Sequence, residues 1–172
     1  TEANNLALLG CARAHSLKTG SPGHLITLST EHHAVLDPLR QLKREGFRLT
    51  ELDPSSNGLL SSRQLEDAIE DDTFLVSIMM VNNEIGVIQP LAELASVCKK
   101  KGIIFHSDAA QAFGHLEIDV NVAGIDLMTI SAHKLYGPKG IGALIIRQEI
   151  PIEPLQWGGG QESGLRPGTI PL

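Results

Sequence analysis

The chain has 172 residues, a formal net charge of −6, and 42% hydrophobic but only 3% aromatic residues. A chain of this length can bury one substantial core, and because aromatic side chains are scarce that core must be aliphatic, which favours buried parallel strands over an aromatic platform for nucleic-acid bases. The longest run of basic residues is the lysine run at 99–101, so we expect no nucleic-acid partner and no membrane partner.

Taken in chain order, apolar periodicity and capping signals predict alternating helices and strands. Helices are expected at 2–18, 31–45, 61–70 and 90–101, and strands at 24–29, 47–52, 73–80, 103–106, 126–131 and 141–147. The run at 73–80 is continuously apolar, as in a strand covered on both faces. The run at 141–147 is expected to pair as a return strand. This order predicts an α/β fold with a mostly parallel sheet flanked by helices.

The two cysteines, Cys11 and Cys98, lie far apart in the sequence and match neither a disulfide framework nor a zinc motif. Each falls within a predicted helix. Cys98 shares a helical face with Leu91 and Leu94, so we interpret both as core thiols rather than catalytic groups.

Polar residues follow the carboxyl ends of four predicted strands, where ligands bind in sheets of this kind. Singly, each has a plain structural explanation: a surface histidine, a helix cap or a turn. Together they predict one pocket that holds an acid, a ring, amide donors and an amine. The candidate residues are His32, Asn83, Asp108, Gln111, Ser131, His133 and Lys134.

Lys134 follows an apolar strand and precedes a glycine-rich loop. A lysine there is most simply a solvated loop residue. If the pocket shields its amine and lowers its pKa, the neutral amine becomes a nucleophile toward carbonyl groups. We therefore hypothesise Schiff-base chemistry at Lys134.

Two other kinds of site fit the pattern poorly. No histidine pair has metal-ligand spacing on a helix, so a metal site is not predicted. The glycines at 137, 140 and 142 precede a strand rather than link a strand to a helix, which argues against a dinucleotide loop. Pyridoxal 5′-phosphate (PLP) requires an amine, an acid, a stacking ring and phosphate donors, and all four are available.

At these residues the chain resembles PLP enzymes of the aminotransferase class V superfamily, and in particular the cysteine desulfurases of the iron–sulfur-cluster and nitrogen-fixation type. The resemblance covers essentially the whole chain. It implies the large domain of a type I PLP-dependent transferase, with residues 1–172 forming its central part and a C-terminal small domain absent. The motifs that carry it are TEANNL (1–6), TEHHAVL (30–36), VNNEIG (81–86), HSDAAQ (106–111), SAHKLYGPKG (131–140), GGGQE (158–162) and LRPGT (165–169).

The resemblance implies a role for each residue around the cofactor ring. Lys134 is similar to the lysine that binds PLP covalently and moves the substrate α-proton. Asp108 resembles the carboxylate that pairs with the pyridine nitrogen, and His32 the histidine that stacks on the ring. Gln111 resembles the donor to the phenolate oxygen. Asn83 resembles the asparagine near that oxygen and the substrate carboxylate.

The same resemblance implies how the phosphate is held. Thr1, Ser131 and His133 resemble phosphate ligands. Thr169 resembles a residue that reaches the phosphate of a neighbouring subunit, which implies a homodimer.

The implied reaction converts L-cysteine to L-alanine and leaves sulfur as a persulfide for iron–sulfur cluster assembly, with a sulfur acceptor or scaffold protein as partner. The family's persulfide cysteine and its substrate-binding arginine would lie beyond Leu172, so the chain alone is expected to be inactive. Alternatives are a selenocysteine lyase and a non-catalytic interaction module. We expect a cytoplasmic location, with an organellar origin left open. Ser163 stands where the family usually has arginine, which affects the expected dimer-loop contacts.

Overall fold

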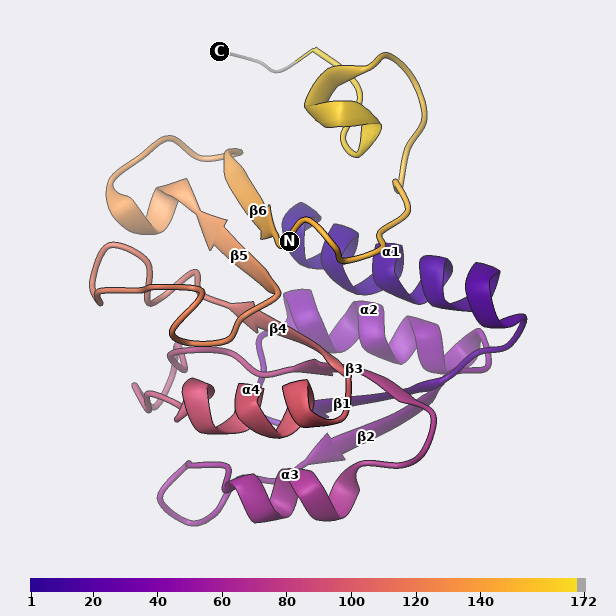
Figure 1. Ribbon diagram of the computed structural model, residues 1–172. Coiled ribbons are helices and arrows are strands. Elements are labelled where there is room, and N and C mark those ends of the chain that lie inside the picture. Colours follow the sequence, from indigo (N-terminus) through magenta and orange to yellow (C-terminus); the bar gives the residue numbers. More distant parts are fainter. Residues whose placement is uncertain (170–172) are drawn as a thin grey trace.

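The computed structural model describes residues 1–169, which form a six-stranded sheet with helices on both faces (Figure 1). The strand order is β2-β1-β3-β4-β5-β6, and every neighbouring pair is parallel except β5 and β6. The predicted return strand is thus confirmed as the antiparallel edge. The strands are β1 (His24–Leu28), β2 (Arg48–Leu52), β3 (Thr73–Ser77), β4 (Ile104–Asp108), β5 (Leu127–Ser131) and β6 (Gly142–Ile146).

Two helices cover each face of the sheet, so the predicted α/β layers are confirmed. Leucine and alanine side chains of the first two helices pack on the face that presents Leu25, Leu75 and Leu127. The other two helices pack on the face that presents Ile26, Val76 and other aliphatic side chains. The α-helices are α1 (Glu2–Thr19), α2 (His33–Arg44), α3 (Ser62–Ala68) and α4 (Leu91–Lys100), and two short 3₁₀ helices are η1 (Ala132–Leu135) and η2 (Gln161–Gly164).

Local sequence signals explain where two of these helices begin and end. Ser61 caps α3 in a reciprocal capping box, because its hydroxyl accepts from the Gln64 amide while the Gln64 side chain accepts from the Ser61 amide. Helix α1 ends at Gly20, which adopts φ 76° and donates its amide to Ser16. A left-handed residue here is least costly as glycine.

The two cysteines are buried in the helical layers, as predicted. Cys11 lies in α1 and Cys98 in α4, and both are free thiols. Burial raises the pKa of each thiol to about 12, so neither is a thiolate at neutral pH.

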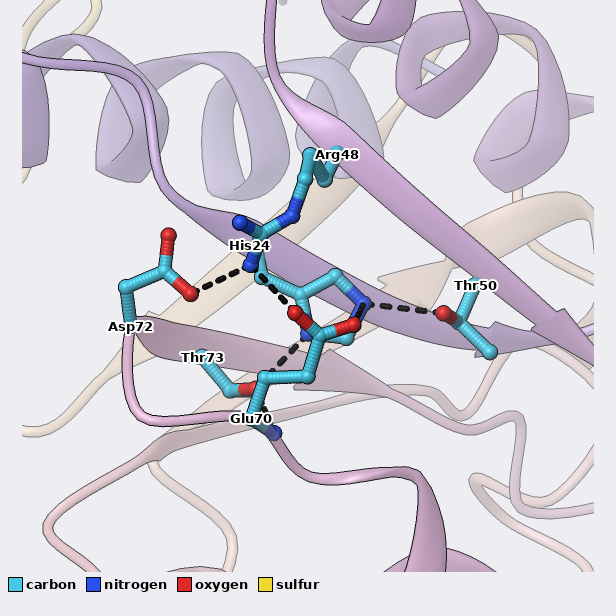
Figure 2. Close-up of polar contacts among 6 residues, drawn as sticks. All are labelled: His24, Arg48, Thr50, Glu70, Asp72 and Thr73. Carbon is cyan, nitrogen blue, oxygen red and sulfur yellow. Dashed lines mark hydrogen bonds and ion pairs between the residues drawn. The ribbon is translucent and has the colours of Figure 1, made fainter.

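A cluster of hydrogen-bonded and ion-paired side chains lies at the edge of the sheet where β1 and β3 begin (Figure 2). His24 is 1% exposed, and its two ring nitrogens lie 2.7 Å from Thr73 Oγ1 and 2.9 Å from Thr50 Oγ1. Arg48 pairs with both Glu70 and Asp72 on the solvent side. This cluster joins β1, β2 and β3 at their amino ends.

The segment after β6 runs along α1 and ends beyond the sheet (Figure 1). The Glu153 amide donates to the Gly10 carbonyl at 3.1 Å, and Arg166 Nε lies 2.7 Å from Glu2 Oε1. These contacts hold residues 151–169 beside the amino-terminal half of α1. Within the part of the chain that the structure describes, none of the helices has the length and apolar character needed to cross a bilayer.

Candidate functional site

Parallel pairing of β1, β3, β4 and β5 brings the loops that follow these strands to one edge of the sheet, which we call the carboxyl edge. His32, Asn83, Asp108 and Lys134 each follow a different one of these strands. Four positions spread over about a hundred residues of sequence are thus assembled by topology, as expected for ligand sites in such sheets.

Asp108 is the buried acid of this edge. It ends β4 and is 6% exposed. Its Oδ2 accepts from Asn4 Nδ2 at 2.7 Å, and its Oδ1 accepts from the Ala110 amide at 2.9 Å. The two donors fix the orientation of this carboxylate. The alternative that Asp108 caps a following helix is wrong, because residues 109–126 form a series of turns.

Asn4 is a site residue that the sequence reasoning did not single out. It lies in α1, is 1% exposed, and its Oδ1 has no hydrogen-bond partner in the described chain. The available signal was an amide in a helix shortly before the apolar residues Leu6, Ala7 and Leu8, which belong to the same buried stretch. Buried amides need partners, and Asp108 is the partner that topology supplies.

Lys134 lies in η1, the single 3₁₀ turn that follows β5 directly. The turn places Lys134 beyond the end of β5, and the side chain of Lys134 is exposed. The described residues therefore leave this amine exposed and do not provide the shielding that the Schiff-base hypothesis invoked. Tyr136 ends the turn in the left-handed conformation, at φ 61°.

The η1 turn rests on the loop that follows Asp108. The Leu135 side chain lies over Gly114, where a Cβ atom would come within 2.2 Å of Leu135 Cδ2. Gly114 also has φ 82°, so only glycine satisfies both the backbone and the close approach. The contact fixes the amine-bearing turn relative to the acid-bearing loop.

Ser131 lies directly before this turn, His133 lies within it, and their side chains contact each other. Ser131 Oγ lies 2.9 Å from His133 Nδ1, and both side chains are accessible to solvent. A hydroxyl and an imidazole paired beside Lys134 can both donate hydrogen bonds to an anion.

His32 stands at the start of α2 as its N-cap. Its Nδ1 accepts from the Ala34 amide at 3.0 Å, so the proton of the neutral ring lies on Nε2. The ring itself is exposed, and the cap fixes where it stands. His33 is exposed as well and lies 3.6 Å from Asp37 on the outside of α2.

The two adjacent asparagines in the loop after β3 have different roles. Asn82 is buried: its Nδ2 donates to the Thr30 carbonyl at 2.8 Å, and its Oδ1 accepts from the amides of Glu84 and Ile85. Asn83 is exposed at the loop tip. The sequence reasoning selected Asn83, and the structure adds the bond from Asn82 to the loop that carries His32.

Three further predicted residues make no side-chain hydrogen bond among the described residues. Gln111 is half-buried after Asp108, and Thr1 is exposed in front of α1. Thr169 is exposed in the segment after η2, and no described bond joins it to the carboxyl edge. Its predicted role toward a neighbouring subunit stays a prediction.

His106, by contrast, belongs to the core and not to the pocket. It is fully buried in β4, with Nδ1 2.8 Å from Ser77 Oγ and Nε2 3.2 Å from Thr129 Oγ1. Burial lowers its pKa to about 4 against the opposing charge of Asp108. The ring is neutral and joins β3, β4 and β5 beneath the site.

Comparisons with known proteins agree with this geometry. The sequence profile of the family "Aminotransferase class-V" matches residues 1–167. The chain is 53% identical over 173 aligned residues to a protein named "Cysteine desulfurase IscS" from Rickettsia rickettsii, and 55% identical to a protein of that name from Shewanella sp.. Each alignment covers 99% of this chain and 42% of the relative, so the chain spans less than half the length of these relatives.

Solved structures show the same fold. "SspA in complex with cysteine" superposes with a TM-score of 0.93 at 48% identity, and DndA from Streptomyces lividans with a TM-score of 0.90 at 44% identity. Both comparisons cover 99% of this chain and 49% of the solved chain. By sequence profile, close relatives and fold, the chain belongs to the aminotransferase class V family.

Proposed function

We propose that the chain is the cofactor-binding part of a PLP-dependent cysteine desulfurase. The observation that carries this proposal is that two groups lie at the same sheet edge. They are the buried carboxylate of Asp108, which accepts two hydrogen bonds, and the accessible amine of Lys134. Relatives named as cysteine desulfurases and a similar structure solved with cysteine support the substrate class.

The chemistry of the residues fits PLP. The cofactor, when bound, supplies an aldehyde that combines with an amine and a ring that withdraws electrons from the substrate α-carbon. Asp108 would pair with the ring nitrogen, because two donors hold its carboxyl group in place at this edge. Gln111 would donate to the phenolate oxygen, Asn83 would lie near it, and Thr1, Ser131 and His133 would donate to the phosphate.

The remaining steps are assigned to the chain's own groups. Lys134 would bind the cofactor aldehyde, and once the substrate amine replaces it, its free Nζ would take and return the α-proton. His32 would present its ring to the cofactor face, in the orientation that the Ala34 amide fixes. In the overall reaction the C–S bond of L-cysteine breaks, the sulfur forms a persulfide with an acceptor thiolate, and the carbon is protonated to give L-alanine.

The sulfur-accepting step requires a thiolate from outside this chain. Cys11 and Cys98 are both buried, and burial raises their pKa to about 12. A buried neutral thiol is a poor nucleophile. We therefore propose that the acceptor cysteine belongs to the rest of the protein, and that the persulfide then passes to a sulfur acceptor or iron–sulfur scaffold protein.

We also propose that the working protein is a homodimer. The support is the resemblance at Thr169 together with its exposed position in the segment that Arg166 ties to α1. A second subunit would then supply Thr169 to the phosphate of the first.

Titration with PLP and then L-cysteine tests the proposal. We expect PLP to give the visible absorbance of a lysine-bound cofactor, L-cysteine to shift that band, and alanine to remain undetectable without an added thiol acceptor. K134A should lose the band. K139A is the matched control, because Lys139 is exposed in the same loop. A folded protein that gives no band, or a K134A variant that keeps it, would refute the assignment.

A further inference from the structure

Glu31 is a buried carboxyl group beside the site with no role in the proposed reaction. It lies in the loop between β1 and α2, directly before His32, and is 6% exposed. Its Oε1 accepts a hydrogen bond from the Met79 amide at 2.5 Å. Glutamates are almost never buried unless they are paired, so this placement needs an explanation.

The bond from Met79 joins two loops that both contribute to the site. Glu31 belongs to the loop that carries His32, and Met79 to the segment that leads from β3 to Asn83. A second bond, from Asn82 Nδ2 to the Thr30 carbonyl at 2.8 Å, joins the same two loops. Each exposed site residue, His32 and Asn83, therefore directly follows a buried residue that fixes its loop.

The second oxygen of Glu31 indicates the protonation state. Oε2 is buried and has no hydrogen-bond partner among the described residues. An ionised carboxylate with one donor and one unpartnered oxygen would be costly in such a place. A neutral acid avoids the cost of a buried charge in that place.

Glu31 and Asp108 thus have opposite environments at the same edge. Asp108 receives a donor on each oxygen, whereas Glu31 receives a donor on Oε1 alone among the described residues. Burial raises the pKa of Glu31 well above its ordinary value. The hydrogen bond from the Met79 amide lowers this pKa, and the charge of Asp108, at the end of β4, raises it. Burial is the largest of these effects, so the neutral form of Glu31 is favoured.

We propose that Glu31 is a positioning residue, a neutral carboxylic acid that fixes the His32 loop against the Asn83 loop. The part of this inference that concerns the cofactor rests on the proposed function. The clamp and the protonation state of Glu31 are properties of the chain alone.

Infrared spectroscopy of the chain tests the protonation state directly. The wild type at pH 7 should show the C=O stretch of a protonated carboxylic acid, and E31Q should lack it. E84Q is the matched control, since Glu84 is exposed in the loop after β3, and it should keep the band. The wild-type spectrum alone decides the matter if E31Q does not fold: no acid band at pH 7 overturns the proposal.

Amide hydrogen exchange tests the clamp. E31Q keeps an oxygen in the Oε1 position and should leave exchange at Met79 within about twofold of wild type, whereas E31A should speed it at least about tenfold, as expected for the loss of one buried hydrogen bond. PLP affinity should follow the same order, with E31A weaker by about tenfold and E31Q unchanged. Equal effects of E31Q and E31A would overturn the positioning role. A chain that binds no PLP yet shows the acid band and the Met79 protection would contradict the proposed function alone.

Discussion

The parallel sheet has an amino edge, where its strands begin, and a carboxyl edge, where they end, and both edges carry polar residues. The two edges differ in how many of these polar groups have hydrogen-bond or ion-pair partners. At the amino edge, both ring nitrogens of His24 are bonded, and Arg48 is shared by two carboxylates (Figure 2). At the carboxyl edge, Lys134 is exposed, and buried oxygens of Asn4 and Glu31 lack partners in the described chain. A closed network stabilises the fold, whereas an open set of donors and acceptors is what a ligand site requires.

The largest expected effect comes from the carboxyl edge. D108N removes the charge and keeps the shape, so we expect PLP to bind up to about 100-fold more weakly, the scale of a lost charged hydrogen bond, with little change in thermal stability. Fluorescence titration and thermal unfolding measure the two quantities. D67N is the control, because Asp67 is exposed on α3. Unchanged PLP affinity in D108N would place the ring nitrogen elsewhere.

A substitution at the amino edge should lower the stability of the fold and leave the PLP affinity nearly unchanged. H24A removes a buried ring and leaves Thr73 and Thr50 without their shared partner, so we expect a loss of about 2 kcal/mol in the free energy of unfolding. PLP affinity should stay within about twofold. Chemical denaturation and PLP titration test this pair of outcomes. A variant of wild-type stability with weakened PLP binding would reverse the roles that we assign to the two edges.

The pH dependence of folding stability tests the buried His106 independently of the candidate site. Its folded pKa of about 4 lies below the ordinary value of 6.5, so the unfolded chain binds the extra proton first. Its stabilising contribution is present above pH 6.5 and is lost as the pH falls toward 4, with a limiting slope of about 1.4 kcal/mol per pH unit.

Urea denaturation of wild type and H106Q between pH 7 and pH 4 isolates this term, since Glu31 titrates in both proteins and its raised pKa acts in the opposite direction. The stability difference between wild type and H106Q should shrink on acidification. A difference that is flat with pH would mean that the ring of His106 is not held neutral.

The smallest effect is expected at α3, which carries none of the candidate site residues. S61A removes the serine side of the capping box of α3, which typically costs about 1 kcal/mol. PLP affinity should not change. Unfolding in denaturant, with the exposed helix residue R63A as control, measures the difference. A loss well above that of a cap would show that α3 supports the site.

The layers and most element positions followed from the sequence because periodicity and capping are local. Helices at 2–18 and 90–101 were placed within about a residue of α1 and α4, as clear apolar faces allow. The strand expected at 73–80 ends at Ser77 as β3, although Ile78 and Met80 still donate to backbone carbonyls of His106 and Asp108. An apolar run does not reveal where regular pairing stops.

The site was predictable where a residue follows a strand and unpredictable where packing decides. His32, Asp108 and Lys134 could be chosen because strand ends share one edge. Asn4 could not, since only the packing of α1 on β4 brings its amide to Asp108. His106 belongs to the same HSDAAQ motif as Asp108, yet the pleat of β4 turns its ring between Ser77 and Thr129 in the core. A shift of one residue decides which face a strand side chain occupies.

The most direct test of the account locates the covalent bond. Chain incubated with PLP, reduced with borohydride and digested should yield one labelled peptide, with the label on Lys134. D108N should lower the extent of labelling, and H24A should not. Labelling of Lys139 to the same extent as Lys134, or no label on a folded chain, would contradict the claim that the carboxyl edge builds a PLP site around Lys134.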